Sequence, residues 1–298
     1  MMIDGRTRPA GVVGWPIEHS LSPAMHNAAY AEMGLNWAYL PYAVPDQGAL
    51  LRFADMARSI PFVGFNVTMP YKQAILELCD EVAMLAQMAG AVNTVHCTEG
   101  RLIGYNTDSR GLLESLAEEA AFVPEGKRVV VLGAGGAAGA AVASFILGKA
   151  AHLTIVNRDV ERAEGLKDRA ARYLRGMEVV TTAPGDYAEE AVRAADLVVN
   201  ATSLGMKPDD PSPIPVEWLH AGLIVYDMVY CAHPTALHVG ASSMGARTLG
   251  GLGMLVAQGA LAIDIWTESA QVHAPRATMR EAVEQALVSE ETLGGDDR

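Results

Sequence analysis

The chain has 298 residues, of which 50% are apolar and 19% are charged, a composition typical of a folded globular protein and unlike that of a disordered one. Its formal net charge of −13 at pH 7 disfavours binding to nucleic acid or to an anionic membrane surface, because both carry negative charge themselves. Since no apolar stretch reaches the roughly 20 residues of a membrane span and no signal-peptide core is present, we expect a cytoplasmic protein.

The amino-terminal third of the chain predicts helices and strands in alternation. Ser22, followed by Pro23, predicts the capped start of a helix that ends before Gly34. The next predicted elements are a strand at 37–44, a helix at 48–59, a short strand at 62–67, a helix from Pro70 through Cys79, strands near 92–96 and 102–105, and a helix capped by Asp108 that runs to 119.

A second run of alternating elements follows the turn-forming residues 123–127. Residues 128–132 are continuously apolar, which predicts a strand buried on both faces of a parallel sheet. Beyond Gly253, a segment that is apolar on nearly every side predicts a buried helix that packs back on the amino-terminal part. The other elements predicted here are strands at 153–156, 178–181, 197–200 and 223–228, and helices at 160–174 and 189–195.

These elements predict an α/β fold with two domains. The first is an amino-terminal α/β substrate domain formed by residues 1–107 with 252–298, to which the carboxy-terminal helices return. The second, residues 108–251, is expected to be a doubly wound Rossmann domain that binds a dinucleotide.

The loop GAGGAAG carries the expected dinucleotide site. Gly133, Gly135 and Ala138 occupy its small-residue positions, directly after a predicted strand and before a helix that begins near Gly136. Small residues let the backbone approach a pyrophosphate, whose charge meets the free N–H groups at the helix start. A Gly-rich turn with a purely structural role is the alternative.

The residues after the next predicted strand indicate which dinucleotide binds. That strand is followed by Asn157 and not by the acid that commonly binds the ribose 2′-hydroxyl of NAD. Arg158 and Arg162 lie one helical turn apart and are placed to bind a 2′-phosphate, so we expect NADP. Asp159 lies between them and either steers Arg158 or repels the phosphate, which leaves NAD as an alternative. Two ordinary surface arginines would explain the same pattern without a ligand.

Four polar clusters lie where predicted strands of the first domain meet their loops, the usual place for ligands in open α/β sheets. They are Ser20 with Ser22, Thr68 with Lys72, Asn93, and Asn106 with Asp108. Taken singly, each residue has a simpler explanation as a helix cap or a surface charge. His19 and His26 beside the serines do not indicate a Ser–His hydrolase, because the Gly-x-Ser-x-Gly pattern of a nucleophile elbow is absent.

Together with GAGGAAG at 133–139, NATSLGM at 200–206, DMVY at 227–230 and GGLGMLVAQG at 250–259, these clusters resemble the shikimate dehydrogenase family. The resemblance is specific, because separate motifs from both domains match in the same order over nearly the whole chain. It implies a reversible NADP-linked reduction of 3-dehydroshikimate to shikimate, a step of chorismate and aromatic amino acid biosynthesis.

The resemblance also implies the residues of the site. Ser20 and Ser22 would hold the substrate carboxylate, and Lys72 and Asp108 would form the catalytic pair that exchanges a proton with the substrate without a metal. Thr68, Asn93, Tyr230 and Gln258 would complete the substrate site. The implied cofactor contacts are Gly133, Ala134, Gly135, Gly136, Ala137, Asn157, Arg158, Arg162, Thr202, Ser203, Met228 and Gly251.

The sequence departs from the family pattern in two places. Asp159 stands where NADP-using members usually carry Thr, and Cys231-Ala232 stands where the family tends to carry Asn-Pro. An NAD-dependent quinate/shikimate dehydrogenase is the nearest alternative, although Ser22 favours shikimate, since quinate users tend to carry Thr there. A non-catalytic ligand-sensing regulator is a remote alternative, because such a domain is expected to lose the Lys72–Asp108 pair.

The remaining expectations concern metals and partners. Cys79, Cys97 and Cys231 are far apart and have no metal-ligand spacing, so we expect no metal, and thiols that fill apolar space in a reducing compartment. The expected partner is the small-molecule substrate, with neither nucleic acid nor membrane, and the expected state is a monomer or a homodimer.

Overall fold

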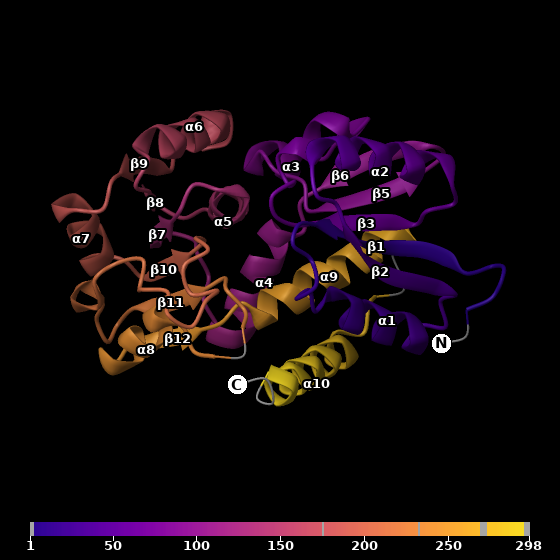
Figure 1. Ribbon diagram of the computed structural model, residues 1–298. Helices are drawn as coiled ribbons and strands as arrows, with labels where there is room; N and C mark the ends of the chain where they lie inside the picture. The colour runs from indigo at the N-terminus through magenta and orange to yellow at the C-terminus, as the bar shows by residue number, and fades with distance from the viewer. Residues whose placement is uncertain (1–2, 175, 232, 269–272, 295–298) are drawn as a thin grey trace. The chain divides into compact units, whose positions relative to one another are not determined.

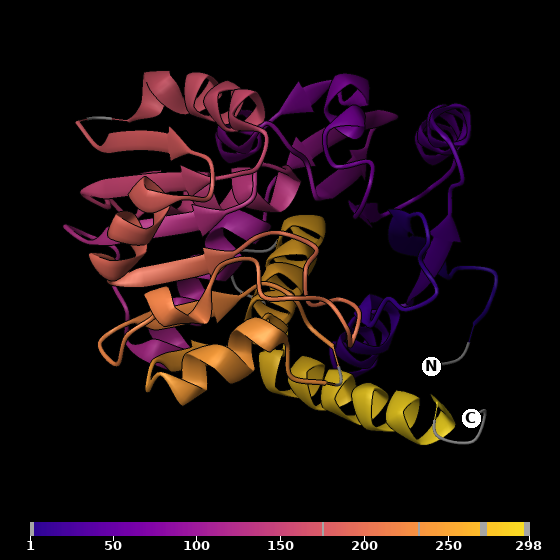
Figure 2. The same ribbon diagram turned by 60° about the vertical axis from the view of Figure 1, so that its left-hand side comes forward.

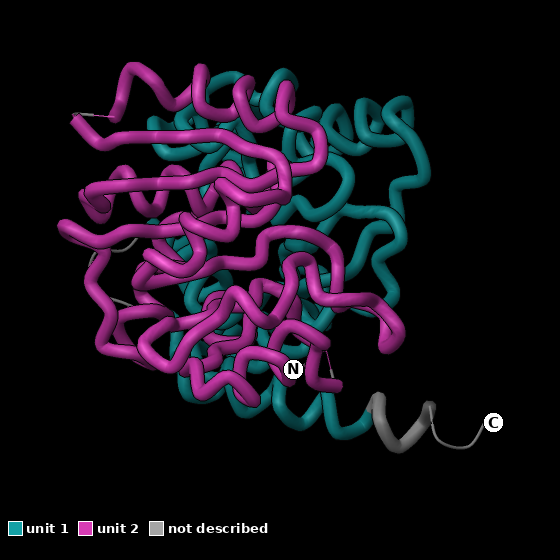
Figure 3. The backbone as a smooth tube through the Cα atoms, turned by 90° about the vertical axis from the view of Figure 1, so that its left-hand side faces the viewer, with its two compact units in different colours: residues 1–107, 255–298 teal, residues 108–254 magenta. Residues whose placement is uncertain are grey.

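The computed structural model describes residues 3–174, 176–231, 233–268 and 273–294, with side chains up to residue 289. The chain forms two compact units, which Figure 3 distinguishes by colour. Unit 1 comprises residues 1–107 and 255–298, and unit 2 comprises residues 108–254. The chain therefore leaves unit 1 after Thr107 and returns to it at Leu255.

Unit 1 is built on a six-stranded mixed sheet with the strand order β2-β1-β3-β5-β6-β4. Its strands are β1 (Arg8–Gly14), β2 (Trp37–Ala43), β3 (Gly64–Val67), β4 (Glu81–Val82), β5 (Thr94–Thr98) and β6 (Arg101–Tyr105). β1 pairs in parallel with β2 and β3, whereas β5 runs antiparallel to both β3 and β6. As a result, β1, β3 and β6 all end at the same edge of the sheet.

Helices cover the sheet of unit 1. They are α1 (Ser22–Glu32), α2 (Gln47–Ser59), the 3₁₀ helix η1 (Ala74–Leu78), α3 (Met84–Ala89), α9 (Leu252–Thr267), which lies mostly in this unit, and α10 (Arg276–Gly294). Leu50 and Phe53 of α2 belong to a buried cluster with Phe65 of β3 and Val95 of β5. α2 thus covers one face of the sheet.

The carboxy-terminal helices complete the opposite face. Figures 1 and 2 both show α10, in yellow, beside α1. Trp266 of α9 donates a hydrogen bond from Nε1 to Val95 O at 2.9 Å, and His26 of α1 stacks on Tyr39 of β2 with 4.0 Å between ring centroids. The predicted return of the carboxy-terminal helices to the first part of the chain is confirmed.

Unit 2 contains a parallel six-stranded sheet with the order β12-β11-β10-β7-β8-β9. Its strands are β7 (Arg128–Leu132), β8 (His152–Val156), β9 (Glu178–Thr182), β10 (Leu197–Asn200), β11 (Ile224–Asp227) and β12 (Arg247–Leu249). Counted from β7 as the first strand, this is the 3-2-1-4-5-6 order of doubly wound nucleotide-binding sheets. The predicted α/β fold with a Rossmann sheet is confirmed.

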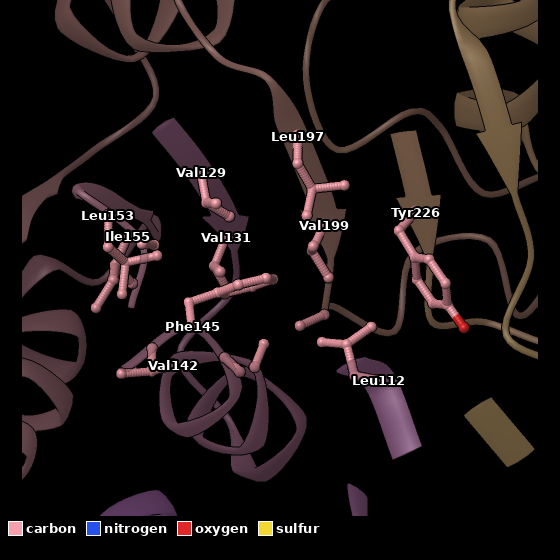
Figure 4. Packing of buried hydrophobic residues seen from close by; sticks show 14 of the residues in the cluster. Leu112, Val129, Val131, Val142, Phe145, Leu153, Ile155, Leu197, Val199 and Tyr226 are labelled. Carbon is pink, nitrogen blue, oxygen red and sulfur yellow. The ribbon is translucent and has the colours of Figure 1, made fainter. Parts of the chain in front are cut away.

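The helices of unit 2 pack on buried clusters made mostly of alanine, leucine and valine side chains. Figure 4 shows Val131 of β7 and Val199 of β10 on the side of the sheet that faces Phe145 of α5 and Leu112 of α4. The helices are α4 (Asp108–Ala120), α5 (Gly136–Leu147), α6 (Val160–Ala170), α7 (Asp186–Arg193) and α8 (Ala236–Ser243), with short 3₁₀ helices η2 (Ala171–Tyr173) and η3 (Val216–Trp218). Across the described ranges, no helix combines the length and the apolar character needed to cross a bilayer.

Two predicted helix starts were wrong. Ser22 is not the cap of α1, because Leu21 holds the cap position without a side-chain hydrogen bond and Ser22 is the first helical residue. Asp108 likewise lies in the first turn of α4 instead of ahead of it. Both side chains are consequently placed one residue further into their helices than expected.

The helix predicted from Pro70 through Cys79 was also wrong, since only η1 is helical there. Leu76 N donates to Gln73 O, three residues back, at 3.3 Å, as in a 3₁₀ turn, while Lys72 O accepts from Val92 N at 2.8 Å. Lys72 therefore lies in a turn ahead of η1 and not inside a helix that begins at Pro70.

Candidate functional site

The polar clusters of unit 1 lie at one edge of its sheet. Ser20 and Ser22 follow β1, and Thr68 and Lys72 follow β3. Asn93 precedes β5, which runs in the opposite direction to β3. Because the carboxyl ends of β1 and β3 and the amino end of β5 share an edge, the topology gathers these residues in one place.

The two serines are joined within the segment after β1. Ser20 Oγ accepts a hydrogen bond from Ser22 N at 3.4 Å. His26 Nδ1 lies 2.9 Å from Ser22 O, and because a carbonyl oxygen can only accept, the Nδ1–H donates to it. Burial lowers the pKa of His26 to about 4, which keeps the imidazole neutral near pH 7. His26 therefore holds the backbone of Ser22 and is not the base of a Ser–His hydrolase.

Asn93 and Gln258 come together although they are far apart in the sequence. Both are buried. Asn93 Oδ1 accepts from Thr107 N at 2.7 Å, and since a backbone N–H can only donate, this bond sets the orientation of the amide. Asn93 Nδ2 then donates to Gln258 Oε1 at 3.4 Å, while Gln258 Nε2 donates to Leu255 O at 2.8 Å. α9 thus brings Gln258 to the segment before β5.

Thr68 and Lys72 lie in the tight loop after β3. Thr68 N donates to Val13 O at 2.9 Å, which holds the loop beside the end of β1. The bond from Val92 N to Lys72 O, at 2.8 Å, ties the same loop to the segment that carries Asn93. Both side chains are half-buried. Four of the predicted substrate contacts of unit 1 therefore lie on segments that are hydrogen-bonded to one another.

In unit 2 the GAGGAAG loop joins β7 to α5 as predicted. Gly133 has a φ of +111°, and a Cβ there would lie 3.0 Å from Ala201 O, so a side chain would be strained. Gly135 caps α5 without a side-chain hydrogen bond, and a Cβ there would meet nothing within 4 Å. Open space beside uncapped N–H groups is what a pyrophosphate requires.

Arg158 and Arg162 flank the start of α6. Both are exposed, and neither guanidinium forms an ion pair with another residue that the structure describes. Asp159 is the N-cap of α6, where its carboxylate accepts from Arg162 N at 3.2 Å. Asn157 Nδ2 donates to Asp159 O at 2.7 Å. Asp159 is therefore engaged with the backbone at the helix start and not with either arginine side chain.

The ends of β10 and β11 carry buried polar groups. Asn200 and Asp227 are paired in register and are almost fully buried. Asn200 Oδ1 accepts from Thr202 Oγ1 at 2.7 Å, and Met228 N donates to Asn200 O at 3.0 Å. Burial raises the pKa of Asp227, and hydrogen bonds from Thr235, Val229 and Asn200 oppose this rise. Asn200 thereby contacts both Thr202 and Met228, two of the predicted cofactor contacts.

Asp108 and Tyr230 lie within electrostatic reach of each other in unit 2. Loss of hydration raises the pKa of Tyr230, and the negative charge of Asp108 adds to the rise. Gly251 packs against the same loop, since a Cβ there would lie 2.5 Å from Met228 O. The other member of the predicted catalytic pair, Lys72, belongs to unit 1, so the pairing of Lys72 with Asp108 stays a prediction.

Several buried polar residues behind the predicted contacts were not assigned a role from the sequence. They are Asn66, Thr94 and Thr107 in unit 1, and Asp227 and Thr235 in unit 2. Of these, Asp227 could have been noticed in the sequence, because it is an acid within the apolar segment predicted as a strand at 223–228. An acid in such a place is rarely buried unless hydrogen bonds hold it. Within the described residues, no group of three or more His, Cys, Asp and Glu side chains has the arrangement of a metal site.

Comparison with known proteins gives three family matches along the chain. The Shikimate dehydrogenase substrate binding domain matches residues 12–95, and the Shikimate / quinate 5-dehydrogenase family matches residues 115–206. The Shikimate 5′-dehydrogenase C-terminal domain matches residues 251–284. These matches fall in both units.

Individual relatives agree along nearly the full chain. The shikimate dehydrogenase (NADP(+)) of Methanopyrus kandleri is 44% identical over 290 residues, which are 96% of this chain and 98% of that protein. Shikimate 5-dehydrogenase from Thermus thermophilus, solved in complex with NADP(H) and shikimate, is 37% identical with a TM-score of 0.82 and covers 94% of this chain and 100% of its own. Quinate dehydrogenase from Corynebacterium glutamicum, in complex with NAD, is 31% identical with a TM-score of 0.85, over 94% and 99% of the two chains.

Proposed function

Because the chain belongs to the shikimate dehydrogenase family, we propose that it catalyses the reversible NADP-linked reduction of 3-dehydroshikimate to shikimate, in chorismate and aromatic amino acid biosynthesis. It is an oxidoreductase that acts on a CH–OH group. One observation carries the proposal: the topology of unit 1 gathers Ser20, Ser22, Thr68, Lys72 and Asn93 at one sheet edge, in a chain 44% identical to an NADP-linked shikimate dehydrogenase.

The cofactor site of unit 2 fits NADP. The space at Gly135 suits a pyrophosphate beside the start of α5, and the exposed Arg158 and Arg162 suit a 2′-phosphate. The chemistry that the nicotinamide would supply when bound is hydride transfer to or from the carbon that bears the reacting oxygen. The remaining proposed contacts are Gly133, Ala134, Gly136, Ala137 and Asn157 on the phosphate and ribose side, and Thr202, Ser203, Met228 and Gly251 on the nicotinamide side.

The proposed substrate contacts of unit 1 differ in which group of the substrate they would bind. Ser20 and Ser22 would donate hydroxyl hydrogen bonds to the carboxylate of the substrate. Asn93 Nδ2 donates to Thr107 Oγ1 at 3.0 Å and to Gln258 Oε1 at 3.4 Å, so both amide hydrogens already have acceptors within unit 1. An amide oxygen can accept two hydrogen bonds, so Gln258 Oε1 would accept a further one from a hydroxyl group of the substrate.

We propose that Lys72 and Asp108 carry the proton transfer. During reduction, the ammonium of Lys72 would donate a proton to the carbonyl oxygen as negative charge develops there, and in oxidation the amine would take it back. Asp108 would hold the ammonium in place with its carboxylate. The hydroxyl of Tyr230, whose pKa is raised by burial and by the charge of Asp108, would lie beside the same oxygen.

One assay tests the proposal directly. Shikimate and quinate are each measured with NADP and with NAD, and kcat/KM is compared across the four combinations. A preference of about tenfold or more for shikimate with NADP, equivalent to roughly 1.4 kcal/mol in the transition state, supports the proposal. A preference for quinate with NAD would overturn it.

The second candidate is an NAD-dependent quinate/shikimate dehydrogenase. Asp159 at the start of α6 favours it, because its negative charge lies between the two arginines that would bind the 2′-phosphate. A non-catalytic ligand-sensing role would give binding of the acid with no turnover in any of the four combinations.

We also propose a cellular compartment and an oligomeric state for the protein. The three cysteines are free thiols, which supports a reducing compartment such as the cytoplasm. We propose a monomer or a homodimer that works on a small molecule, with neither nucleic acid nor membrane as partner. Light scattering after size-exclusion chromatography separates the two oligomeric states.

A further inference from the structure

Asp227 is a buried acid that forms no ion pair with the residues the structure describes. It is the last residue of β11, and only 2% of its surface is exposed. A carboxylate removed from water in this way has to be held by hydrogen bonds, because burial without partners is costly. The surrounding chain supplies these bonds from three separate segments.

Each bond to Asp227 favours the charged carboxylate. Oδ1 accepts from Asn200 Nδ2 at 2.9 Å and from Val229 N at 3.1 Å, and Oδ2 accepts from Thr235 Oγ1 at 2.7 Å. Thr235 Oγ1 itself accepts from His238 N at 3.1 Å, which leaves its hydrogen to be donated to Oδ2. Asp227 thus joins the end of β10, the segment after β11 and the N-cap of α8.

The bond to Asn200 extends into the loop after β10. Asn200 Oδ1 accepts from Thr202 N at 3.1 Å and from Thr202 Oγ1 at 2.7 Å. Thr202 Oγ1 in turn accepts from Leu204 N at 3.1 Å, and Asn200 Nδ2 also donates to Leu204 O at 3.1 Å. The side chain of Asn200 therefore holds this loop in place by hydrogen bonds, and the Asn200 amide is itself held by the bond from its Nδ2 to Asp227 Oδ1.

We propose that Asp227 is a positioning residue for the reaction. Through Asn200 it orders the loop with Thr202 and Ser203, and through Val229 N it orders the loop with Met228 and Tyr230. This inference rests on the proposed function, in which these loops hold the nicotinamide and the reacting end of the substrate. Asp227 acts through the loops and contacts neither ligand itself.

A carboxylate is needed at this position because donors approach both of its oxygens. In Asp227→Asn one oxygen remains for one group of donors, while the amide N–H₂ confronts the donor on the other side. At least one of the hydrogen bonds to this side chain therefore has to break or reverse its direction, and the segment that it held loses its fixed position.

The first test compares Asp227→Asn with Asp196→Asn. Asp196 precedes β10 at the opposite edge of the same sheet and accepts from Arg128 N at 2.9 Å, so it matches Asp227 in substitution and unit but not in location. In Asp227→Asn we expect kcat with shikimate and NADP to fall about 10- to 100-fold, because loops that hold reacting groups are displaced. The Kd for NADP, measured by fluorescence, should change less than about threefold, since the phosphates anchor the cofactor. Equal kcat values in the two variants would overturn the inference.

A second pair of variants guards against a failure of Asp227→Asn to fold. Thr235→Val keeps the shape of the side chain but removes the hydroxyl that donates to Oδ2, whereas Thr235→Ser keeps the hydroxyl. We expect Thr235→Val to lose kcat in the same direction as Asp227→Asn, and Thr235→Ser to retain it. Equal losses in both would point to packing at Thr235 and would contradict the inference.

Hydrogen exchange without any ligand provides a readout that does not depend on turnover. The amides of Thr202, Leu204 and Val229 should exchange faster in Asp227→Asn, while that of Gly133, bonded to Val156 O at 2.8 Å, should not change. Unchanged protection of the three loop amides would overturn the inference even if kcat falls. If the unmodified chain does not turn over shikimate with NADP, the proposed function fails, and the exchange comparison still decides whether Asp227 orders these loops.

Discussion

The phenol of Tyr230 reports on the charge of Asp108. Loss of hydration is the larger cause of its raised pKa, and the Asp108 carboxylate is the smaller one. Asp108→Asn removes that charge, so the pKa of Tyr230 should fall while staying above its ordinary value. NMR titration of ¹³C-labelled tyrosine, assigned with Tyr230→Phe, measures the change. Asp108→Glu keeps the charge and should leave the pKa in place; a pKa that does not move in Asp108→Asn would contradict the proximity.

Lys72 should matter for turnover far more than for binding. Lys72→Ala removes the proposed proton donor, and we expect kcat to fall by about 10²- to 10⁴-fold, with the Kd of shikimate changed much less. Lys72→Arg keeps a positive charge but does not release a proton near neutral pH, so it should be nearly as inactive. Steady-state kinetics together with calorimetric binding of shikimate separates the two effects. Activity in Lys72→Arg close to that of the unmodified chain would exclude the acid/base role.

The two exposed arginines at the start of α6 should distinguish NADP from NAD. Arg158→Ala or Arg162→Ala removes a charged hydrogen-bond donor, so KM for NADP should rise by about tenfold or more while KM for NAD stays nearly constant. Arg169→Ala, near the end of the same helix, is the control for a general loss of positive charge. A parallel rise of KM for both cofactors would show that neither arginine reads the 2′-phosphate.

At the scale of the element, Asp159 acts as a cap and as a charge, and two substitutions separate these effects. Asp159→Ala loses the bond to Arg162 N, so the free energy of unfolding should fall by about 1 kcal/mol. Asp159→Asn keeps a good cap and should leave stability nearly unchanged. If the carboxylate repels the phosphate, both variants should bind NADP more tightly. Denaturant unfolding and NADP binding are the two measurements, and equal stability of the two variants would contradict the capping role.

Elements with a strong local signal could be predicted from the sequence. The strands predicted at 128–132 and 197–200 coincide with β7 and β10, because strands buried on both faces form continuous apolar runs between polar residues. β1 was missed, since Pro9 and Gly11 obscure its pattern. The segment after Pro70 was wrongly predicted as a helix from its local pattern. The hydrogen bond from Val92 N to Lys72 O joins residues far apart in the sequence, so the local sequence gives no sign of it.

The same limit applies to the candidate site. The glycines of the loop after β7 could be predicted, because their conformation follows from the missing side chain. The burial and orientation of the Asn66 side chain could not be predicted, because they depend on Tyr39 OH, which donates to Asn66 Oδ1 at 2.8 Å from a different strand. A buried side chain whose partner lies on another strand is identified only when the register of the sheet is known.

At the scale of the whole molecule, His26 should make stability depend on pH. Burial lowers its pKa in the folded chain from 6.5 to about 4, whereas in the unfolded chain it titrates at its ordinary pKa. The unfolded state therefore binds more protons between these values. The contribution of neutral His26 is complete above pH 6.5 and is lost as the pH falls toward 4, by roughly 3 kcal/mol in total.

Denaturant unfolding between pH 4 and 7, followed by tryptophan fluorescence, tests this dependence. The control is His26→Asn, whose amide N–H replaces Nδ1–H opposite Ser22 O but does not titrate. Its baseline stability will differ, so the comparison rests on the slope with pH, which should be smaller by the contribution of His26. Parallel slopes for the two proteins would exclude His26 as the titrating group.

The division of unit 1 between both ends of the chain has a consequence for biosynthesis. Trp266 of α9, whose Nε1 bonds to Val95 O, is translated long after the strand that it covers. A ribosome-bound nascent chain that has reached residue 254 holds all of unit 2 but leaves the apolar underside of β3 and β5 without its lid. Completion of the first unit must therefore wait until α9 and α10 have left the ribosome, and premature termination within α9 would expose a surface prone to aggregation.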